Sequence, residues 1–140
     1  MRRRSPATAG LINAAEATGN PWALSYALVA FGVAFRHADP VVVLEAGRRG
    51  LQVAEDSSNR LTGTYLAMLV ARIEAECGDS LRALHYIDVG IHNYHDSGNP
   101  TLMRAPMAIL AAVLDRMGCY EPAAIIAGFA STAFAVTTRA

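Results

Sequence analysis

The chain has 140 residues and carries 12 basic and 12 acidic side chains, so its formal net charge at pH 7 is zero. Zero net charge provides no overall field to attract nucleic acid or an anionic membrane, and we expect no direct binding to either. Apolar residues make up 53% and charged residues 17% of the sequence. This composition predicts either a tightly packed core or a surface that binds a partner.

In chain order, the sequence predicts seven helices and no strand. Asn20, Asp39 and Asn99 each stand directly before a proline, which is the typical pairing of a helix N-cap with a first helical residue that needs no N–H donor. Glycines near the expected helix ends are suited to the left-handed conformation that terminates a helix. The predicted helices are 7–18, 21–37, 40–56, 60–77, 80–96, 100–117 and 121–135.

Two segments are less regular than the others. Val41, Val42 and Val43 are β-branched, but they follow an Asp-Pro cap and continue at helical spacing, so we expect a helix there. Pro106 falls inside 100–117, where it would remove a backbone hydrogen bond and clash with the preceding turn. We therefore expect that helix either to begin near residue 104 or to be kinked.

A repeat of roughly 40 residues organises these helices. A short turn followed by the start of an apolar stretch at helical spacing occurs three times, at residues 38–47, 78–87 and 118–127. Such a period is typical of two-helix units that stack into a solenoid. We therefore predict one all-α domain over 1–140, built of antiparallel helix pairs. The predicted repeats are 21–56, 60–96 and 100–135, with a half-repeat at 7–18.

Four stretches carry a resemblance to a known group of repeats: 17–27, 38–47, 78–84 and 118–128. The chain resembles the tetratricopeptide-like helical repeats at the C-terminal end of bacterial ATPase-containing LuxR-type regulators and adenylate cyclase-like signalling proteins. The resemblance implies a right-handed solenoid and a regulatory role, with the chain corresponding to the detached C-terminal part of a larger regulator. The sequence contains no GxxxxGK[ST] loop, cyclase core or DNA-binding helix-turn-helix. ATP binding, cyclase activity and DNA binding therefore do not carry over.

The residues best suited to contact a ligand or partner are Trp22, Tyr26, Tyr65 and Arg72. Trp22 and Tyr26 are one helical turn apart, and Arg72 interrupts an apolar helix that a solenoid would place along its groove. Core packing is the alternative use of Trp22 and Tyr26, and it is the commoner use of aromatic residues at the start of a repeat. In a second hypothesis, the groove around these residues binds a small-molecule effector.

Histidine and aspartate gather on one side of the predicted helix 80–96. His85, Asp88, His92 and His95 fall within roughly a third of its circumference. His92 and His95 are weak candidates for a metal site or for a pH-sensitive surface. The solvated face of an amphipathic helix is the simpler interpretation, so we expect no metal ion and no cofactor.

The remaining polar residues indicate no catalytic site. Arg48 and Arg49 have acidic neighbours such as Glu45, and we expect weak surface ion pairs among them. Cys77 and Cys119 form no CxxC motif and predict no disulfide framework, which is typical of a reduced, cytoplasmic setting. No nucleophile elbow, paired-carboxylate motif or metal signature occurs, so we do not expect an enzyme.

The last predicted helix is largely apolar, with no charge from residue 122 through 138. The end of a solenoid normally has a polar outer face. We therefore expect Ile125, Ile126, Phe129 and Phe134 to form an interface with a protein partner or with a second copy of the chain. Taken together, the patterns predict a non-catalytic, cytoplasmic protein-interaction module.

Overall fold

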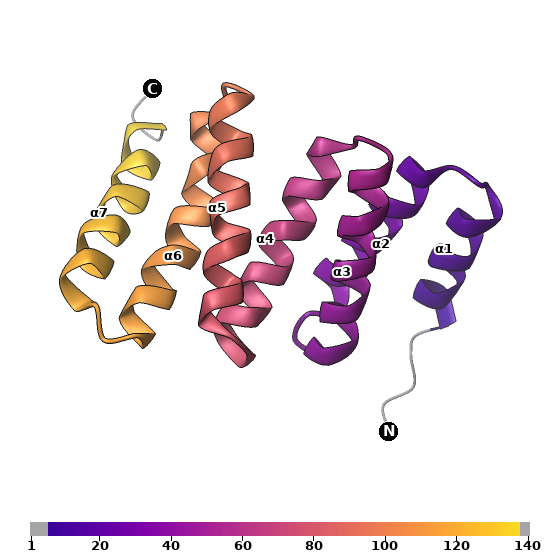
Figure 1. Cartoon of the computed structure of the whole chain (residues 1–140), viewed down its shortest axis with the longest axis horizontal. Coiled ribbons are helices and arrows are strands. Elements are labelled where there is room, and N and C mark those ends of the chain that lie inside the picture. The colour runs from indigo at the N-terminus through magenta and orange to yellow at the C-terminus, as the bar shows by residue number, and fades with distance from the viewer. Residues whose placement is uncertain (1–5, 138–140) are drawn as a thin grey trace. The chain divides into compact units, whose positions relative to one another are not determined.

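The computed structural model describes residues 6–137, and it describes side-chain surroundings for residues 10–131. This part of the chain is all-helical, with seven α-helices and one short 3₁₀ helix (Figure 1). The elements are α1 (Pro6–Ala17), α2 (Pro21–Phe35), α3 (Pro40–Asp56), α4 (Arg60–Cys77), α5 (Ser80–Asp96), η1 (Pro100–Met103), α6 (Arg104–Arg116) and α7 (Tyr120–Thr137). The predicted helices are confirmed to within two residues at each end, apart from the start of α6.

Of the three caps expected from the sequence, Asn20 and Asp39 hold helix starts, whereas the side chain of Asn99 makes no capping hydrogen bond. The Asn20 side chain accepts a hydrogen bond from the Trp22 N–H at 2.9 Å, and the Asp39 side chain accepts one from the Val42 N–H at 3.2 Å. At the start of α4, Oδ1 of Asn59 accepts from the Thr62 N–H at 3.3 Å. These side chains satisfy backbone donors that lack a partner inside the helix.

Pro106 divides the predicted helix 100–117 into two elements. Residues 100–103 form η1, and α6 begins at Arg104, so Pro106 is the third residue of α6 and is buried. In the first turn of an α-helix a residue has no intrahelical partner for its N–H, so a proline is tolerated there. The first of the two expected outcomes, a helix that begins near residue 104, is therefore confirmed.

Left-handed residues close several helices, and one of them is not a glycine. Gly19, Gly98 and Gly118 have φ values of 65°, 68° and 81°. Ser58 has a φ of 53° and follows α3 in the same way that Gly19 follows α1 and Gly98 follows α5. A side chain in this conformation is strained by contact between its Cβ and the backbone.

The chain divides into two compact units, residues 1–69 and 70–140, and the division falls inside α4. In the first unit, α2 packs against both α1 and α3 (Figure 1). Its core contains the fully buried side chains of Leu28, Val43 and Leu66. The close approach of α3 requires the absence of a side chain at Gly50, where a Cβ would lie 2.8 Å from Leu66 Cδ1.

In the second unit, α6 packs against both α5 and α7 (Figure 1). Ile87 on α5, Val113 on α6 and Ala123 on α7 are buried between them. The buried carboxylate of Glu74 accepts a hydrogen bond from the Asp79 N–H at 3.0 Å. Asp79 in turn caps α5, because its Oδ1 accepts from the Leu81 N–H at 2.8 Å. The turn between α4 and α5 is thus held from both sides.

Candidate functional site

Two contacts in the first unit show that α2 and α4 lie side by side and run in the same direction. Ser25 near the start of α2 contacts Thr62 near the start of α4, with 3.1 Å between the hydroxyl oxygens. Further along, a Cβ at Gly32 would collide with Leu69. Between the first contact and the second, the contacting residue moves forward by seven positions on α2 and by seven positions on α4. Only helices that run in the same direction allow this.

A small buried polar cluster joins α2 to α4. The side-chain amide of Asn59 donates to Ser25 Oγ at 3.3 Å, and the Thr62 hydroxyl donates to the same oxygen. Ser25 Oγ itself donates to the Trp22 carbonyl at 2.9 Å. All three cluster side chains are fully buried. Because buried polar groups need partners, the cluster fixes how the two helices start relative to each other.

Large apolar side chains are exposed along both of these helices. On α2, Trp22 is 50% exposed and Tyr26 is 47% exposed; on α4, Leu61 is 48% and Tyr65 is 41% exposed. Val33 extends the row on α2. Trp22 and Leu61 are 39 residues apart, as are Tyr26 and Tyr65, so the two rows occupy equivalent positions in the repeat. We call these five side chains the aromatic face.

Helix geometry places both rows on the same side of the first unit. At about 100° per residue, the α2 row lies roughly a quarter-turn from the residues that contact α4. The α4 row lies about a quarter-turn from the residues that contact α2, but in the opposite sense. The contacting sides of two parallel helices face each other. A quarter-turn away from contact in one sense on α2, and in the opposite sense on α4, therefore points in the same direction. The aromatic face is therefore a single apolar surface.

The sequence identified three of these five side chains. Core packing, the commoner use of aromatic residues at such positions, does not account for Trp22 and Tyr26, because the two side chains are about half exposed. Leu61 and Val33 were missed, although their spacing from the aromatic residues could have revealed them. Arg72 is half-buried on α4, seven residues after Tyr65, and it belongs to the second unit.

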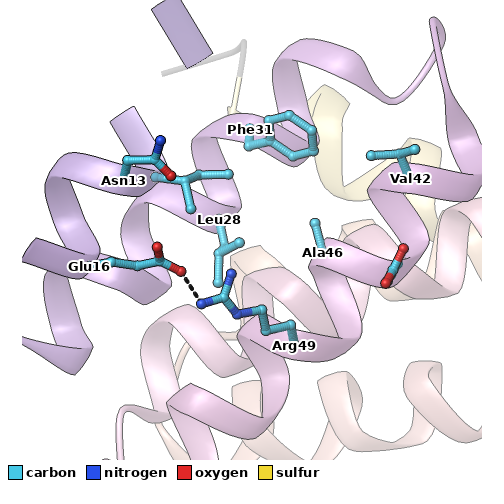
Figure 2. A pocket seen from close by; sticks show the side chains of 9 residues that line it. Asn13, Glu16, Leu28, Phe31, Val42, Ala46 and Arg49 are labelled. Carbon is cyan, nitrogen blue, oxygen red and sulfur yellow. Dashed lines mark hydrogen bonds and ion pairs between the residues drawn. The ribbon is translucent and has the colours of Figure 1, made fainter. Parts of the chain in front are cut away.

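A second feature of the first unit is a pocket of about 340 Å³ between α1 and α3 (Figure 2). Both helices pack on α2, which supplies Leu28 and Phe31 to the lining, and a space remains between them. The other lining residues are Ile12, Asn13 and Glu16 of α1 and Val42, Glu45, Ala46 and Arg49 of α3. The lining thus combines five apolar side chains with four polar or charged ones, and the polar ones come from α1 and α3.

An ion pair spans the pocket from α1 to α3. The guanidinium of Arg49 contacts the carboxylate of Glu16, 33 residues away in sequence (Figure 2). The expected pairing of Arg49 with nearby acidic residues of α3 is therefore wrong. Glu45, one turn before Arg49, makes no hydrogen bond or ion pair with another described residue. The described lining thus contains two carboxylates and one guanidinium, and of the two carboxylates the guanidinium contacts only that of Glu16.

Two of the three histidines of α5, His92 and His95, pair with neighbouring aspartates, whereas the ring of His85 contacts that of Tyr86. Nδ1 of His92 lies 2.9 Å from the Asp88 carbonyl oxygen and 3.2 Å from its carboxylate, and Nδ1 of His95 lies 3.4 Å from Asp96. The hydrogen bond to the Asp88 carbonyl, followed by the negative charges of Asp88 and Asp96, raises the pKa of His92 above 6.5. In the described part of the chain, no group of three or more His, Cys, Asp or Glu residues could hold a metal ion.

The apolar residues singled out on the last helix differ in their surroundings. Ile125 and Phe129 are 67% and 61% exposed on the outer side of α7. Ile126 is half-buried, and the side chain of Phe134 lies outside the described side chains. Two of the four predicted interface residues are therefore free to contact a partner.

Comparison of the chain with protein families, curated proteins and solved structures found no match. Among the described helices, none combines the length and the apolar character needed to cross a membrane.

Proposed function

We propose that the chain is a non-catalytic helical-repeat module that binds a segment of another protein on the aromatic face. The observation that carries the proposal is the alignment of exposed apolar rows on two parallel helices. A soluble surface seldom displays so many large apolar side chains together unless they contact a partner. Tryptophan and tyrosine are also the residues that most often dominate the energy of protein interfaces.

The form of this surface favours a protein segment over a small molecule. Packed helices have axes about 8–10 Å apart, so the two rows form a strip wide enough for one extended or helical segment. A small molecule needs a concave site, and none of the five side chains of the aromatic face lines the described pocket. At the end of α2 the strip is bordered by Arg36 and His37, whose side chains are 3.0 Å apart. An acidic residue in the partner would be favourable there.

The repeat supports a wider form of the same proposal. Short connections between packed neighbours, the parallel contact of α2 with α4 and the period of roughly 40 residues all suit a tetratricopeptide-like solenoid of antiparallel pairs. In that architecture the first helices of the pairs form the binding groove. By resemblance, we place the module in a cytoplasmic regulatory system, with the uncharged outer side of α7 as a second protein contact.

A peptide selection tests the proposal. A peptide library displayed on phage is selected against the full chain and against Tyr26→Ser/Tyr65→Ser, with Tyr86→Ser on α5 as the matched control. We expect peptides with apolar anchors to bind the wild-type chain and the control, and to bind the double variant at least tenfold more weakly, because each truncated anchor of an interface costs about 1–2 kcal/mol.

Trp22 provides the readout, because it is the one tryptophan in the sequence. Its indole is half exposed on the aromatic face, so a bound peptide should remove it from water and shift its fluorescence to shorter wavelength. Selected peptides that bind the double variant as tightly as the wild-type chain, with no change in Trp22 emission, would show that the aromatic face is not the binding surface.

A further inference from the structure

The pocket between α1 and α3 lies on the other side of α2 from the aromatic face. Taking 100° per residue, Leu28 and Phe31 point roughly opposite to Trp22 and Tyr26. The two surfaces share no residue. A ligand in the pocket would therefore neither block nor require a peptide on the aromatic face.

The pocket has the size of a small-molecule site, with an apolar floor and a polar rim. Its volume of about 340 Å³ lies at the lower end of the range of roughly 300–1,000 Å³ that is typical of ligand pockets. Leu28 and the ring of Phe31 form the apolar floor, with Val42 and Ala46 along the α3 side (Figure 2). Phe31 is held in place by stacking on Phe35, with 5.1 Å between the ring centroids. A compact apolar group would exclude water from this floor.

The charges of the lining determine which sign of charge a bound ligand should carry. Three charged side chains line the pocket: Glu16, Glu45 and Arg49. Arg49 and Glu16 neutralise each other, which leaves the carboxylate of Glu45 outside the ion pair and gives the lining a net negative charge. An anion would be repelled by Glu45 and would have to break the ion pair. A cation gains an attraction to Glu45 without breaking any contact.

From this combination we propose that the pocket binds a small organic cation, namely a protonated amine attached to a compact apolar body. The apolar body lies against Leu28 and Phe31, and the ammonium group pairs with Glu45. The Asn13 amide oxygen is available in the lining as a further acceptor. Contact with Asn13 of α1 and Glu45 of α3 makes the ligand a link between these two helices.

The test uses the full chain at pH 7 and three probes of nearly equal shape: 2-phenylethylamine, 2-phenylethanol and 3-phenylpropionate. Binding is followed by two-dimensional amide NMR. We expect saturable shifts at the backbone amides around the pocket, with the amine binding most tightly, the alcohol less tightly and the acid least. Because an exposed ion pair is screened by salt, the advantage of the amine over the alcohol should shrink at 1 M sodium chloride.

Two variants and one control assign the contacts. Glu45→Gln should weaken binding of the amine by about 1.5- to fivefold, which corresponds to the loss of one exposed ion pair. The affinity for the alcohol should stay unchanged. Glu55→Gln, on the same helix but outside the pocket, should change neither. Ala46→Phe should fill the pocket and abolish binding of all three probes.

Equal affinity for amine and alcohol, or an amine affinity unchanged by Glu45→Gln, would overturn the proposal. Because Glu45 is exposed, this variant retains the packing of α3, and the result is interpretable whatever the fate of the Ala46 variant. If no peptide bound to the aromatic face, the results for amine binding in the pocket would be unaffected. The proposed function and the proposed pocket ligand can therefore be refuted independently.

Discussion

Gly50 offers a direct test of how tightly the first unit is packed. Gly50→Ala adds one methyl group where α3 meets the buried side chains of Leu28 and Leu66. The new carbon would lie 2.8 Å and 3.0 Å from the two Cδ atoms of Leu66 and 3.3 Å from Leu28 Cβ. Leu66, whose Cδ atoms are the closest, is fully buried in a close-packed interior and has little free space into which it can move.

Two opposing terms determine the change in stability. Overpacking a well-packed core costs about 1–3 kcal/mol, whereas alanine is preferred to glycine inside a helix by about 1 kcal/mol. We therefore expect Gly50→Ala to lower the free energy of unfolding by up to about 2 kcal/mol. The matched control is Gly63→Ala on α4, where the added carbon lies at an ordinary contact distance of 3.5 Å from Ala54 Cβ. That variant should gain up to about 1 kcal/mol.

Urea denaturation followed by circular dichroism separates the two outcomes. With a slope of about 1–3 kcal/mol per molar urea, the midpoints should move in opposite directions and differ by roughly 1 M. If both variants were stabilised equally, Leu66 would have to relax freely around the new methyl group. That result would refute the close packing of α3 against α4.

Three further substitutions address the turns, the polar cluster and α5. Ser58→Gly should raise stability by up to about 1 kcal/mol in urea denaturation, because glycine removes the strain of a left-handed φ; no change would mean that the serine is unstrained. Ser25→Ala should lower stability by about 1–3 kcal/mol, because it leaves buried donors on α4 without their acceptor; a neutral result would show that water enters the cluster. His92 should titrate by NMR above pH 6.5, and Asp88→Asn should lower its pKa. Because the folded-state pKa is raised, the stabilising contribution is present below pH 6.5 and is lost as the pH rises through the folded-state value; an unchanged titration would contradict the pairing.

Local signals in the sequence were sufficient to place the helices. The caps at Asn20, Asp39 and Asn59 act within three residues of themselves, so their effect can be deduced without knowledge of the tertiary structure. Pro106 left two outcomes open, because a proline fits a first turn and a kinked interior equally well as a pattern. The backbone of η1 decided between them by ending one residue before Arg104.

The candidate sites were harder to predict because they depend on contacts between distant residues. Arg49 has acidic neighbours one turn away, but its partner is Glu16 on another helix. The pocket likewise arises from how far apart α1 and α3 lie on α2, and no motif encodes that separation. The exposure of Tyr26 could not be read from its spacing either, since the same helical period is found in core and surface rows.

The third copy of the repeat shows that the scaffold does not need the aromatic face. Tyr26 and Tyr65 occupy equivalent positions of the first two copies, and the corresponding residue of the third is Ala105, 40 residues after Tyr65. Ala105 is exposed on α6, which forms its helix without an aromatic side chain there. A residue that folding required at this position would be needed in every copy. Exposed tyrosines in the first two copies add apolar surface and contribute little to the core, which is the pattern that the proposed binding role requires.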